Sequence, residues 1–241
     1  MIKELGNLKN FYNFSHKASS FFYWVFVILS IPGLIWSLFI APIDYLQGHS
    51  YRIIFIHVPS AWMSLQTYML MAAAAIISMI WRVKFMEIFS IQCASIGAVF
   101  TLIALVTGML WGKPTWGTYW VWDARLTSEL ILLFIYLGII SLYQAIDDKR
   151  RASNIVNILI IIGLINIPII HYSVEWWNTL HQGPTVTKLD KPSAHISMLA
   201  PLLYMFVTFQ FFFILVIINK MKLGILARDL NSKWVKEKYN A

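Results

Sequence analysis

Residues 91–111 read IQCASIGAVFTLIALVTGMLW and contain no charged side chain. A helix needs about 20 apolar residues to cross the hydrocarbon core of a bilayer, because each residue advances it by about 1.5 Å. This stretch therefore predicts a transmembrane helix. Five other stretches predict the same, at about 21–43, 58–80, 127–146, 155–171 and 196–219. The stretch 155–171 is short and contains Asn157, Asn166 and Pro168, so we expect it to be the least regular span.

The composition also indicates a membrane protein. The mean hydropathy is +0.67 and only 12% of residues are charged, which lies outside the range of soluble domains. We therefore expect an all-α fold, a polytopic integral membrane bundle of six transmembrane helices with short outer loops, in a single membrane domain over residues 1–241. The first stretch is too long for the apolar core of a signal peptide, so we expect it to remain as the first helix.

The distribution of basic residues predicts the orientation. Of the 19 Lys and Arg residues, fourteen fall on the side of the two termini, and five fall on the other side: Arg52, Lys113, Arg125, Lys188 and Lys191. By the positive-inside rule, both termini should be cytoplasmic in a bacterial inner membrane, with outer loops at about 44–57, 112–126 and 172–195. The basic segment of about 220–241 is expected to be a cytoplasmic tail touching anionic membrane lipid. No nucleic-acid-binding motif accompanies it, so no nucleic acid is expected as a partner.

The first quoted stretch leads into an unusually aromatic segment. Residues 111–123 read WGKPTWGTYWVWD and contain Trp111, Trp116, Trp120 and Trp122. The glycines and the proline argue against a regular helix here. Such a segment at a membrane boundary can lie against a large, flat, apolar ligand. The alternative is an interfacial aromatic belt, but a belt should populate both interfaces, and eight of the eleven tryptophans fall on or near the outer side in this topology.

Five of the six histidines fall in or beside the same outer segments, and imidazole is the usual axial ligand of haem iron. Pro59 suits the first turn of a helix, which would place His57 at the outer mouth of the second span. Local reasoning favours His181 over His171 as a ligand, because His181 precedes a Gly-Pro pair that should end a helix, but it does not decide between them. His49 and His195 are weaker candidates.

Several charged residues lie near these histidines. Arg52, Lys113 and Arg125 could pair with the propionates of a haem, or Arg125 could pair with Asp123. Glu129 falls just inside the fourth span, where carboxylates are rare and often functional. It could accept a hydrogen bond within the bundle or have a haem-linked role, and the sequence leaves both open.

Two further features are expected to be structural. His171 and Glu175 are four residues apart and would share a helix face, which suggests a hydrogen bond between them. Cys93 is the only cysteine, so the chain forms no internal disulfide and has no Cys-x-x-Cys motif, and a small buried side chain is expected there. A glycine-rich phosphate loop is also absent, which excludes ATP hydrolysis by this chain alone.

Three segments together resemble a known family. The pattern W-G-x-x-x-W-G-x-x-W-x-W-D-x-R-L-T-S-E at 111–129 is similar to the tryptophan-rich (WWD) signature of haem-handling proteins in cytochrome c biogenesis. Residues 52–62 and 111–132 also look like the family of haem exporter protein C, also called cytochrome c maturation protein C (CcmC), and residues 171–183 narrow the resemblance to it. The likeness covers most of residues 40–185.

The resemblance implies a site and partners. His57 and His181 match the axial ligands of a haem b, and the loop at about 111–126 matches the haem platform, with Trp111, Trp116, Trp120, Trp122, Asp123 and Arg125. It also implies transfer of haem to the periplasmic haem chaperone CcmE, and partnership with the ABC-type transporter subunits CcmA and CcmB and the small subunit CcmD. The chain would be a transport and transfer protein rather than an enzyme, although assistance to haem attachment is conceivable.

Three other functions are considered beside this one. A haem-conducting channel would need a polar path through the bundle. A membrane b-type cytochrome would bury histidine pairs within its spans to carry electrons across. A purely structural subunit would have interfacial tryptophans and no haem absorption.

Overall fold

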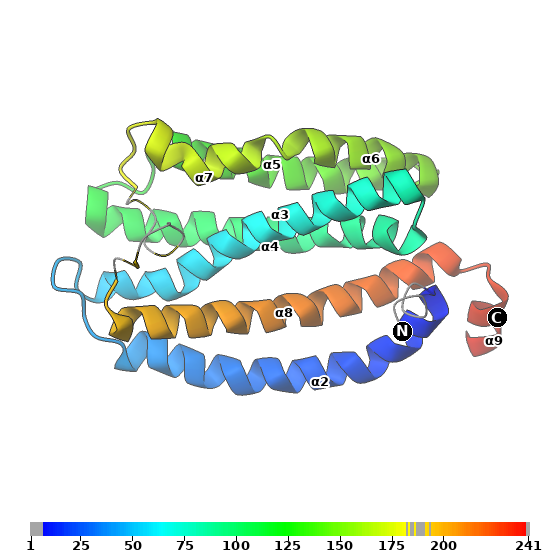
Figure 1. The fold of residues 1–241 in the computed structure, drawn as a ribbon, viewed down its shortest axis with the longest axis horizontal. Coiled ribbons are helices and arrows are strands. Elements are labelled where there is room, and N and C mark those ends of the chain that lie inside the picture. The colour runs from blue at the N-terminus through cyan, green and yellow to red at the C-terminus, as the bar shows by residue number, and fades with distance from the viewer. Residues whose placement is uncertain (1–6, 182, 184–185, 187–190, 193, 240–241) are drawn as a thin grey trace.

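A computed structural model describes residues 7–181, 183, 186, 191, 192 and 194–239 (Figure 1). The elements in this part of the chain are α2 (Leu8–Ile35), the π-helix η1 (Trp36–Ile40), the 3-10 helix η2 (His49–Ile53), α3 (Ile54–Trp81), α4 (Lys84–Trp116), α5 (Ala124–Ala145), α6 (Lys149–Gly163), α7 (Asn166–Trp176), α8 (Ile196–Asp229) and α9 (Lys233–Tyr239). They provide six helical segments long and apolar enough to cross a membrane. The predicted all-α bundle of six spans is therefore confirmed.

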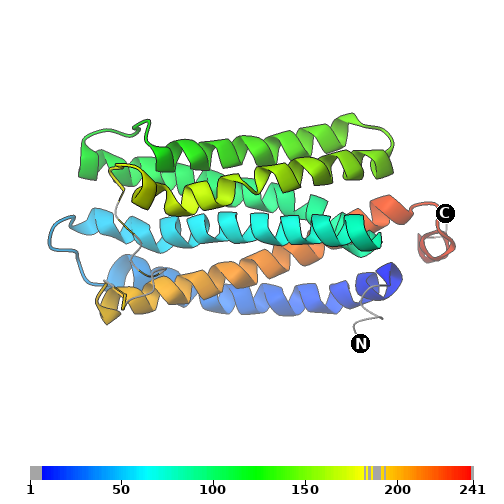
Figure 2. The same ribbon diagram turned by 45° about the horizontal axis from the view of Figure 1, so that its top comes forward.

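The helices form one elongated bundle, in which α3 packs along α4 and α2 packs along α8 (Figures 1 and 2). The connections 41–48 and 117–123 and the described parts of 177–195 gather at one end of the bundle. Both ends of the described chain lie at the opposite end. All candidate site segments therefore share one end, which we call the loop end.

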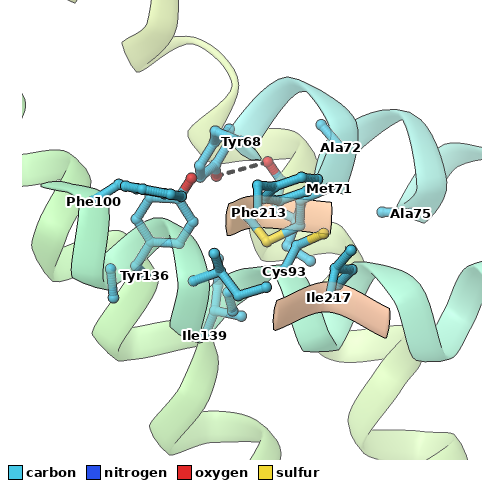
Figure 3. Packing of buried hydrophobic residues seen from close by; sticks show 14 of the residues in the cluster. Tyr68, Met71, Ala72, Ala75, Cys93, Phe100, Tyr136, Ile139, Phe213 and Ile217 are labelled. Carbon is cyan, nitrogen blue, oxygen red and sulfur yellow. Dashed lines mark hydrogen bonds between the residues drawn. The ribbon is translucent and has the colours of Figure 1, made fainter. Parts of the chain in front are cut away.

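The centre of the bundle is closely packed and holds Cys93, which is fully buried as expected (Figure 3). Two buried tyrosines satisfy their hydroxyls on backbone carbonyls of other helices: Tyr68 donates to Ile160 O at 2.9 Å and Tyr136 to Ser64 O at 2.8 Å. Tyr136 fits because it lies against Gly97 of α4, where any added Cβ would overlap its ring. This packing fills the middle of the bundle, between the loop end and the end that holds the chain termini.

The fifth span is irregular, as its short apolar stretch predicts. It consists of α6 and α7, separated at Leu164 and Ile165, where amides donate to carbonyls three residues earlier. Its polar residues are satisfied inside the bundle: Asn157 donates to Ser78 Oγ at 2.9 Å, and Asn166 donates to Ser128 O at 2.9 Å. The asparagines thus hold the broken span to its neighbours.

Two local expectations were wrong. The helix α4 continues through Pro114 to Trp116 and stops at Gly117, whose φ of 80° favours glycine. Pro114 lies in the last turn, so the aromatic segment is non-helical only from Gly117 onward. The second span also begins earlier than expected, because η2 leads directly into α3 at Ile54. Pro59 consequently occupies the second turn of α3, and His57 lies within the helix rather than before it.

Candidate functional site

A large open pocket lies at the loop end between α3, α4, α5, α7 and α8. Its empty volume is about 1200 Å³, with the open mouth included. Apolar side chains such as Val58, Leu65 and Leu202 form much of its wall. Its polar and aromatic lining is Gln47, His57, Trp62, Trp111, Thr115, Trp116, Arg125, His171 and His181.

A smaller recess with an empty volume of about 390 Å³ shares part of this lining. Both cavities are lined by His57, Arg125 and His181, and the recess adds Glu129. Of the predicted site residues, five therefore line the pocket, namely His57, His181, Trp111, Trp116 and Arg125. Trp120, Trp122 and Asp123 do not line either cavity.

His57 is oriented by the backbone of α4. Its Nδ1 lies 3.0 Å from Ala104 O and 3.1 Å from Thr107 Oγ1. The Thr107 hydroxyl uses its hydrogen to donate to Ile103 O at 2.6 Å, and a carbonyl can only accept. The hydrogen between Nδ1 and Ala104 O therefore belongs to His57, whose Nδ1–H donates to the Ala104 carbonyl. This arrangement fixes the tautomer and leaves Nε2 with a free lone pair, as in histidines that ligate metals. The Trp111 ring stands edge-on to the imidazole, with centroids 5.7 Å apart.

His181 is oriented by an acidic side chain instead. Its Nδ1 lies 3.7 Å from Asp123 Oδ2, and its ring lies 4.9 Å from that of Trp116. Asp123 also caps α5, because its Oδ1 accepts from the Leu126 amide at 2.8 Å. Partial burial pushes the pKa of Asp123 upward, but the facing imidazole and the Leu126 amide hold that pKa below its ordinary value. At 3.7 Å the two atoms make no hydrogen bond, so the carboxylate acts on this imidazole as a nearby negative charge, and the contact leaves Nε2 unused.

Among the basic candidates in the described chain, only Arg125 lines the cavities. Its guanidinium donates to Ile170 O at 2.7 Å and thereby joins α5 to α7. Arg52 instead donates to Leu38 O at 2.7 Å and Ala41 O at 2.8 Å, at the end of η1. Lys113 donates to Gly117 O at 3.0 Å. Pairing with an anionic ligand in the pocket is thus available to Arg125, which makes no ion pair with Asp123 within the described residues.

The open alternatives for Glu129 are partly resolved. Ser64 of α3 donates to its Oε1 at 2.9 Å, which is the hydrogen bond within the bundle that the sequence allowed. Glu129 also lines the recess beside both candidate ligands.

The remaining histidines differ in position. His171 lines the pocket from α7 but is exposed, and in the described chain it makes no hydrogen bond or ion pair with Glu175, contrary to expectation. His49 is exposed at the start of η2 and lies outside both cavities. His195 caps α8 by accepting from the Ser197 amide at 3.3 Å.

The other two tryptophans lie on the turn between α4 and α5. Trp120 and Trp122 meet edge-to-face with centroids 5.3 Å apart, and Trp122 is 78% exposed. The buried Nε1 of Trp120 has no hydrogen-bond partner within the described residues. This pair therefore presents an aromatic surface beside the pocket rather than inside it.

Gln47 and Trp62 line the pocket although neither was predicted as a site residue, and Gln47 has a direct structural role there. The indole Nε1 of Trp111 donates to Gln47 Oε1 at 2.6 Å. Gln47 is held in place by Asp44, whose Oδ1 accepts from the Gln47 amide at 2.8 Å in a turn that ends at Gly48. Asp44 and Gly48 indicate a turn in the sequence, but nothing local indicates that Gln47 reaches across to α4.

Known proteins resemble this chain over most of its length. The family model of heme exporter protein C matches residues 1–236. The chain belongs to this family. The match covers the whole bundle, so the resemblance predicted from three segments is confirmed.

Curated members of the haem exporter protein C family align over most of the chain. The heme exporter protein C of Haemophilus influenzae is 46% identical over 225 residues, covering 93% of this chain and 92% of the relative. That of Escherichia coli K12 is 50% identical over 211 residues, covering 88% and 85%. That of Bradyrhizobium diazoefficiens is 46% identical over 206 residues, covering 86% and 78%.

The arrangement indicates what kind of ligand this family member can accommodate. The pocket is lined by three imidazoles, three indole rings and one guanidinium, a set that suits a flat apolar ligand with a metal centre and an acidic edge. No group of three or more His, Cys, Asp or Glu side chains in the described chain is arranged to hold a bare metal ion.

Proposed function

We propose that this protein binds haem at the periplasmic face of the bacterial inner membrane and delivers it to the haem chaperone CcmE for cytochrome c biogenesis. Membership of the haem exporter protein C family supports a role in haem handling. The pocket lined by both His57 and His181 is the observation that carries the proposal. Its position at the loop end, opposite the basic chain ends, supports the periplasmic assignment.

Within this proposal, His57 and His181 bind the iron of one haem b through Nε2. Trp111 and Trp116 provide apolar area against the porphyrin, and Arg125 pairs with a propionate. Asp123 fixes the His181 ring and strengthens it as a donor. Trp120 and Trp122, outside the pocket, form the surface that meets the chaperone as the vinyl edge is presented.

The chain supplies position rather than chemistry. We assign it no catalytic residue of its own, because the reactivity of the vinyl group belongs to haem. Orientation of that edge toward CcmE could still assist attachment, since misplacement of reacting groups is costly. CcmA, CcmB and CcmD are the proposed partners in the same membrane, where the transporter releases loaded CcmE.

The alternatives have less support. A haem-conducting channel would need a polar path through the bundle, whereas Tyr68, Tyr136 and Phe100 fill its centre. A b-type cytochrome that carries electrons across the membrane would need histidines at two depths, whereas His57 and His181 line the same cavity at one end.

The optical spectrum of the purified protein tests the proposal. Wild type should show a six-coordinate haem spectrum, and His57→Ala and His181→Ala should each give five-coordinate or water-ligated iron with weakened haem retention. The double variant should lose nearly all haem. His49→Ala is the matched control, because this exposed outer histidine lies outside both cavities, and it should retain the wild-type spectrum. An unchanged six-coordinate spectrum in the double variant would contradict the assignment of His57 and His181 as ligands and make His171 the next candidate.

A further inference from the structure

We propose that the pocket opens sideways into the bilayer, between α7 and α8, and that haem enters it from the lipid rather than from water. The inference rests on the proposed function, and it adds a route of entry that the ligands and the aromatic walls do not specify. Haem is flat and largely apolar, so most of its surface is favourably placed in hydrocarbon. A side opening would let it reach the pocket without leaving the lipid.

The face of α3 that lines the pocket continues as an exposed face of the same helix. Val58, Trp62 and Leu65 line the pocket and are half-buried. Their spacing of four and three residues places them on one side of the helix, and the same side continues to Met69 and, two turns further, to Ile76. Both of these side chains are exposed, Met69 to 50%. They lie within a span apolar enough to cross the membrane, so this face of α3 is directed toward lipid.

The neighbouring helices of the described chain flank this face of α3 rather than cover it. On one side, Tyr68 donates to Ile160 O of α6 at 2.9 Å. On the other side, Gln66 donates to Gln210 of α8 at 2.9 Å, and Gln210 donates back at 2.6 Å. Positions 66 and 68 are about 200° apart around a helix, so α6 and α8 hold α3 from nearly opposite sides. In both views α3 accordingly runs between the α6–α7 span and α8 (Figures 1 and 2). The exposed face lies between these two contacts.

The same flanking arrangement continues up to the pocket. Val174 of α7 and Leu202 of α8 line it from the two sides. The connection between these two helices passes the loop end of the pocket, because its described residues Gly183 and Val186 also line the cavity. Val186 packs on the apolar cluster that contains Leu202. The chain thus narrows the approach from water, whereas the side toward lipid is bordered by apolar side chains.

The position of Arg125 suits a ligand that arrives from the side. Arg125 is the second residue of α5, near the loop end, and it lines the pocket. A haem in the bilayer keeps its charged propionates near the membrane boundary and its macrocycle in hydrocarbon, as amphipathic side chains do. Sideways entry at this depth brings the propionates to Arg125 without carrying them through the hydrocarbon.

A spin label at Leu65→Cys tests the side opening without haem. Cys93 is fully buried, so the label should attach at the introduced cysteine. In vesicles of phosphatidylethanolamine and phosphatidylglycerol, oxygen, which concentrates in hydrocarbon, should relax this label more than a water-soluble nickel chelate does. Ile76→Cys is the control in lipid, and Asp147→Cys, in the exposed connection between α5 and α6, is the control in water. A label at position 65 that responds to the nickel chelate as at position 147, or to neither reagent, would overturn the inference.

The rate of haem uptake tests the route itself. Haem is dissolved in the lipid of vesicles that contain the protein, with excess apomyoglobin outside to capture haem that reaches water, and the Soret band is followed. Wild type should still load. Leu65→Trp narrows the side opening and should slow uptake about tenfold, with the final six-coordinate spectrum retained. Met69→Trp, one turn further along the same face and outside the pocket, is the matched control and should load at the wild-type rate. Leu65→Phe serves if the tryptophan variant fails to accumulate.

The outcomes separate the two proposals. If wild type binds no haem from any source, the proposed function fails, while the spin label at position 65 still decides whether the pocket is open to lipid. If wild type binds haem but apomyoglobin abolishes loading, or if Leu65→Trp and Met69→Trp load equally fast, haem enters from water and this inference is overturned.

Discussion

The two candidate ligands differ in what orients them. Nδ1 of His57 donates to a carbonyl inside α4, at 3.0 Å, whereas Nδ1 of His181 faces the Asp123 carboxylate at 3.7 Å. The carbonyl belongs to a rigid helix, and the carboxylate belongs to the first residue before α5. His57 is thus the more firmly held of the two candidate ligands, and within the proposed function we expect the His181 side to adjust as haem arrives or leaves.

Gln47 should matter although it touches neither imidazole. Gln47→Ala removes the acceptor of the Trp111 indole, and one lost hydrogen bond of about 1 kcal/mol should weaken haem binding about fivefold. Gln47→Glu keeps an acceptor and should bind nearly as wild type. Titration of apo-protein with haem measures both. Equal affinity of Gln47→Ala and wild type would show that Trp111 is held by packing alone.

The tryptophans should separate haem retention from haem transfer. Trp116 lines the pocket and packs on His181, whereas Trp120 lies outside. An aromatic pair contributes about 0.5–1.5 kcal/mol beyond burial, so Trp116→Ala should weaken haem retention partly, and Trp120→Ala should weaken it less. Both should lower haem transfer, because a tilted porphyrin or an altered docking surface misplaces the vinyl edge.

Haem staining of CcmE, beside the Soret absorbance of this protein from the same cells, measures transfer and retention together. Normal loading of CcmE by both variants would mean that the aromatic segment is a membrane belt. The platform role would then be abandoned.

At the scale of helices, the sequence predicts the number of spans well and their limits poorly. Six apolar stretches suffice to count the spans, but apolarity marks only the part inside the hydrocarbon. Thus α2 begins at Leu8 and α8 continues to Asp229, both well beyond the apolar stretches. The helical course of Trp111–Trp116 was missed because the glycines and Pro114 argue against a helix in the sequence, whereas α4 stays helical through Pro114 up to Gly117.

For the candidate site, too, the sequence predicts which residues take part better than it predicts the contacts between them. His57, His181, Trp111, Trp116 and Arg125 were predicted as site residues from residue type and family pattern, and they line one pocket. Whether they bind haem stays a prediction. The contacts that orient them depend on distant chain segments that pack together, such as the Gln47 turn on α4, and a single sequence does not show such pairs.

Packing of α4 on α5 depends on the absence of a side chain at Gly97. Gly97→Ala would force a Cβ into the Tyr136 ring, and overpacking of this kind costs about 1–3 kcal/mol. We expect a melting temperature in detergent lower by several degrees. Gly138→Ala is the matched control, since no atom lies within 4 Å of its added Cβ. Equal melting temperatures of the two variants would contradict the close approach.

At the scale of the whole molecule, the position of one loop relative to the membrane determines the orientation of all of them. The connections 41–48 and 117–123 share one end with the described parts of 177–195, and the chain ends share the other. We expect the loop end to be periplasmic, because fourteen of the 19 basic residues lie toward the chain ends. A periplasm-specific reporter fused at residue 46 should be active, and fusions at residue 150 or at the C-terminus should be silent. Activity of either silent fusion would reverse the assignment.

The position of α2 at the side of the bundle has a mechanical consequence. This helix packs chiefly on α8, and Arg52 joins the end of its span, through Leu38 and Ala41, to η2. A pulling force applied to the N-terminus would therefore separate α2 from α8 first, before the force reaches the contacts between α3 and α4. Single-molecule extraction should show a first rupture corresponding to the 33-residue span Leu8–Ile40, with a final resistance that Arg52→Ala removes. Rupture of the whole bundle in one step would mean that α2 is coupled to all its neighbours.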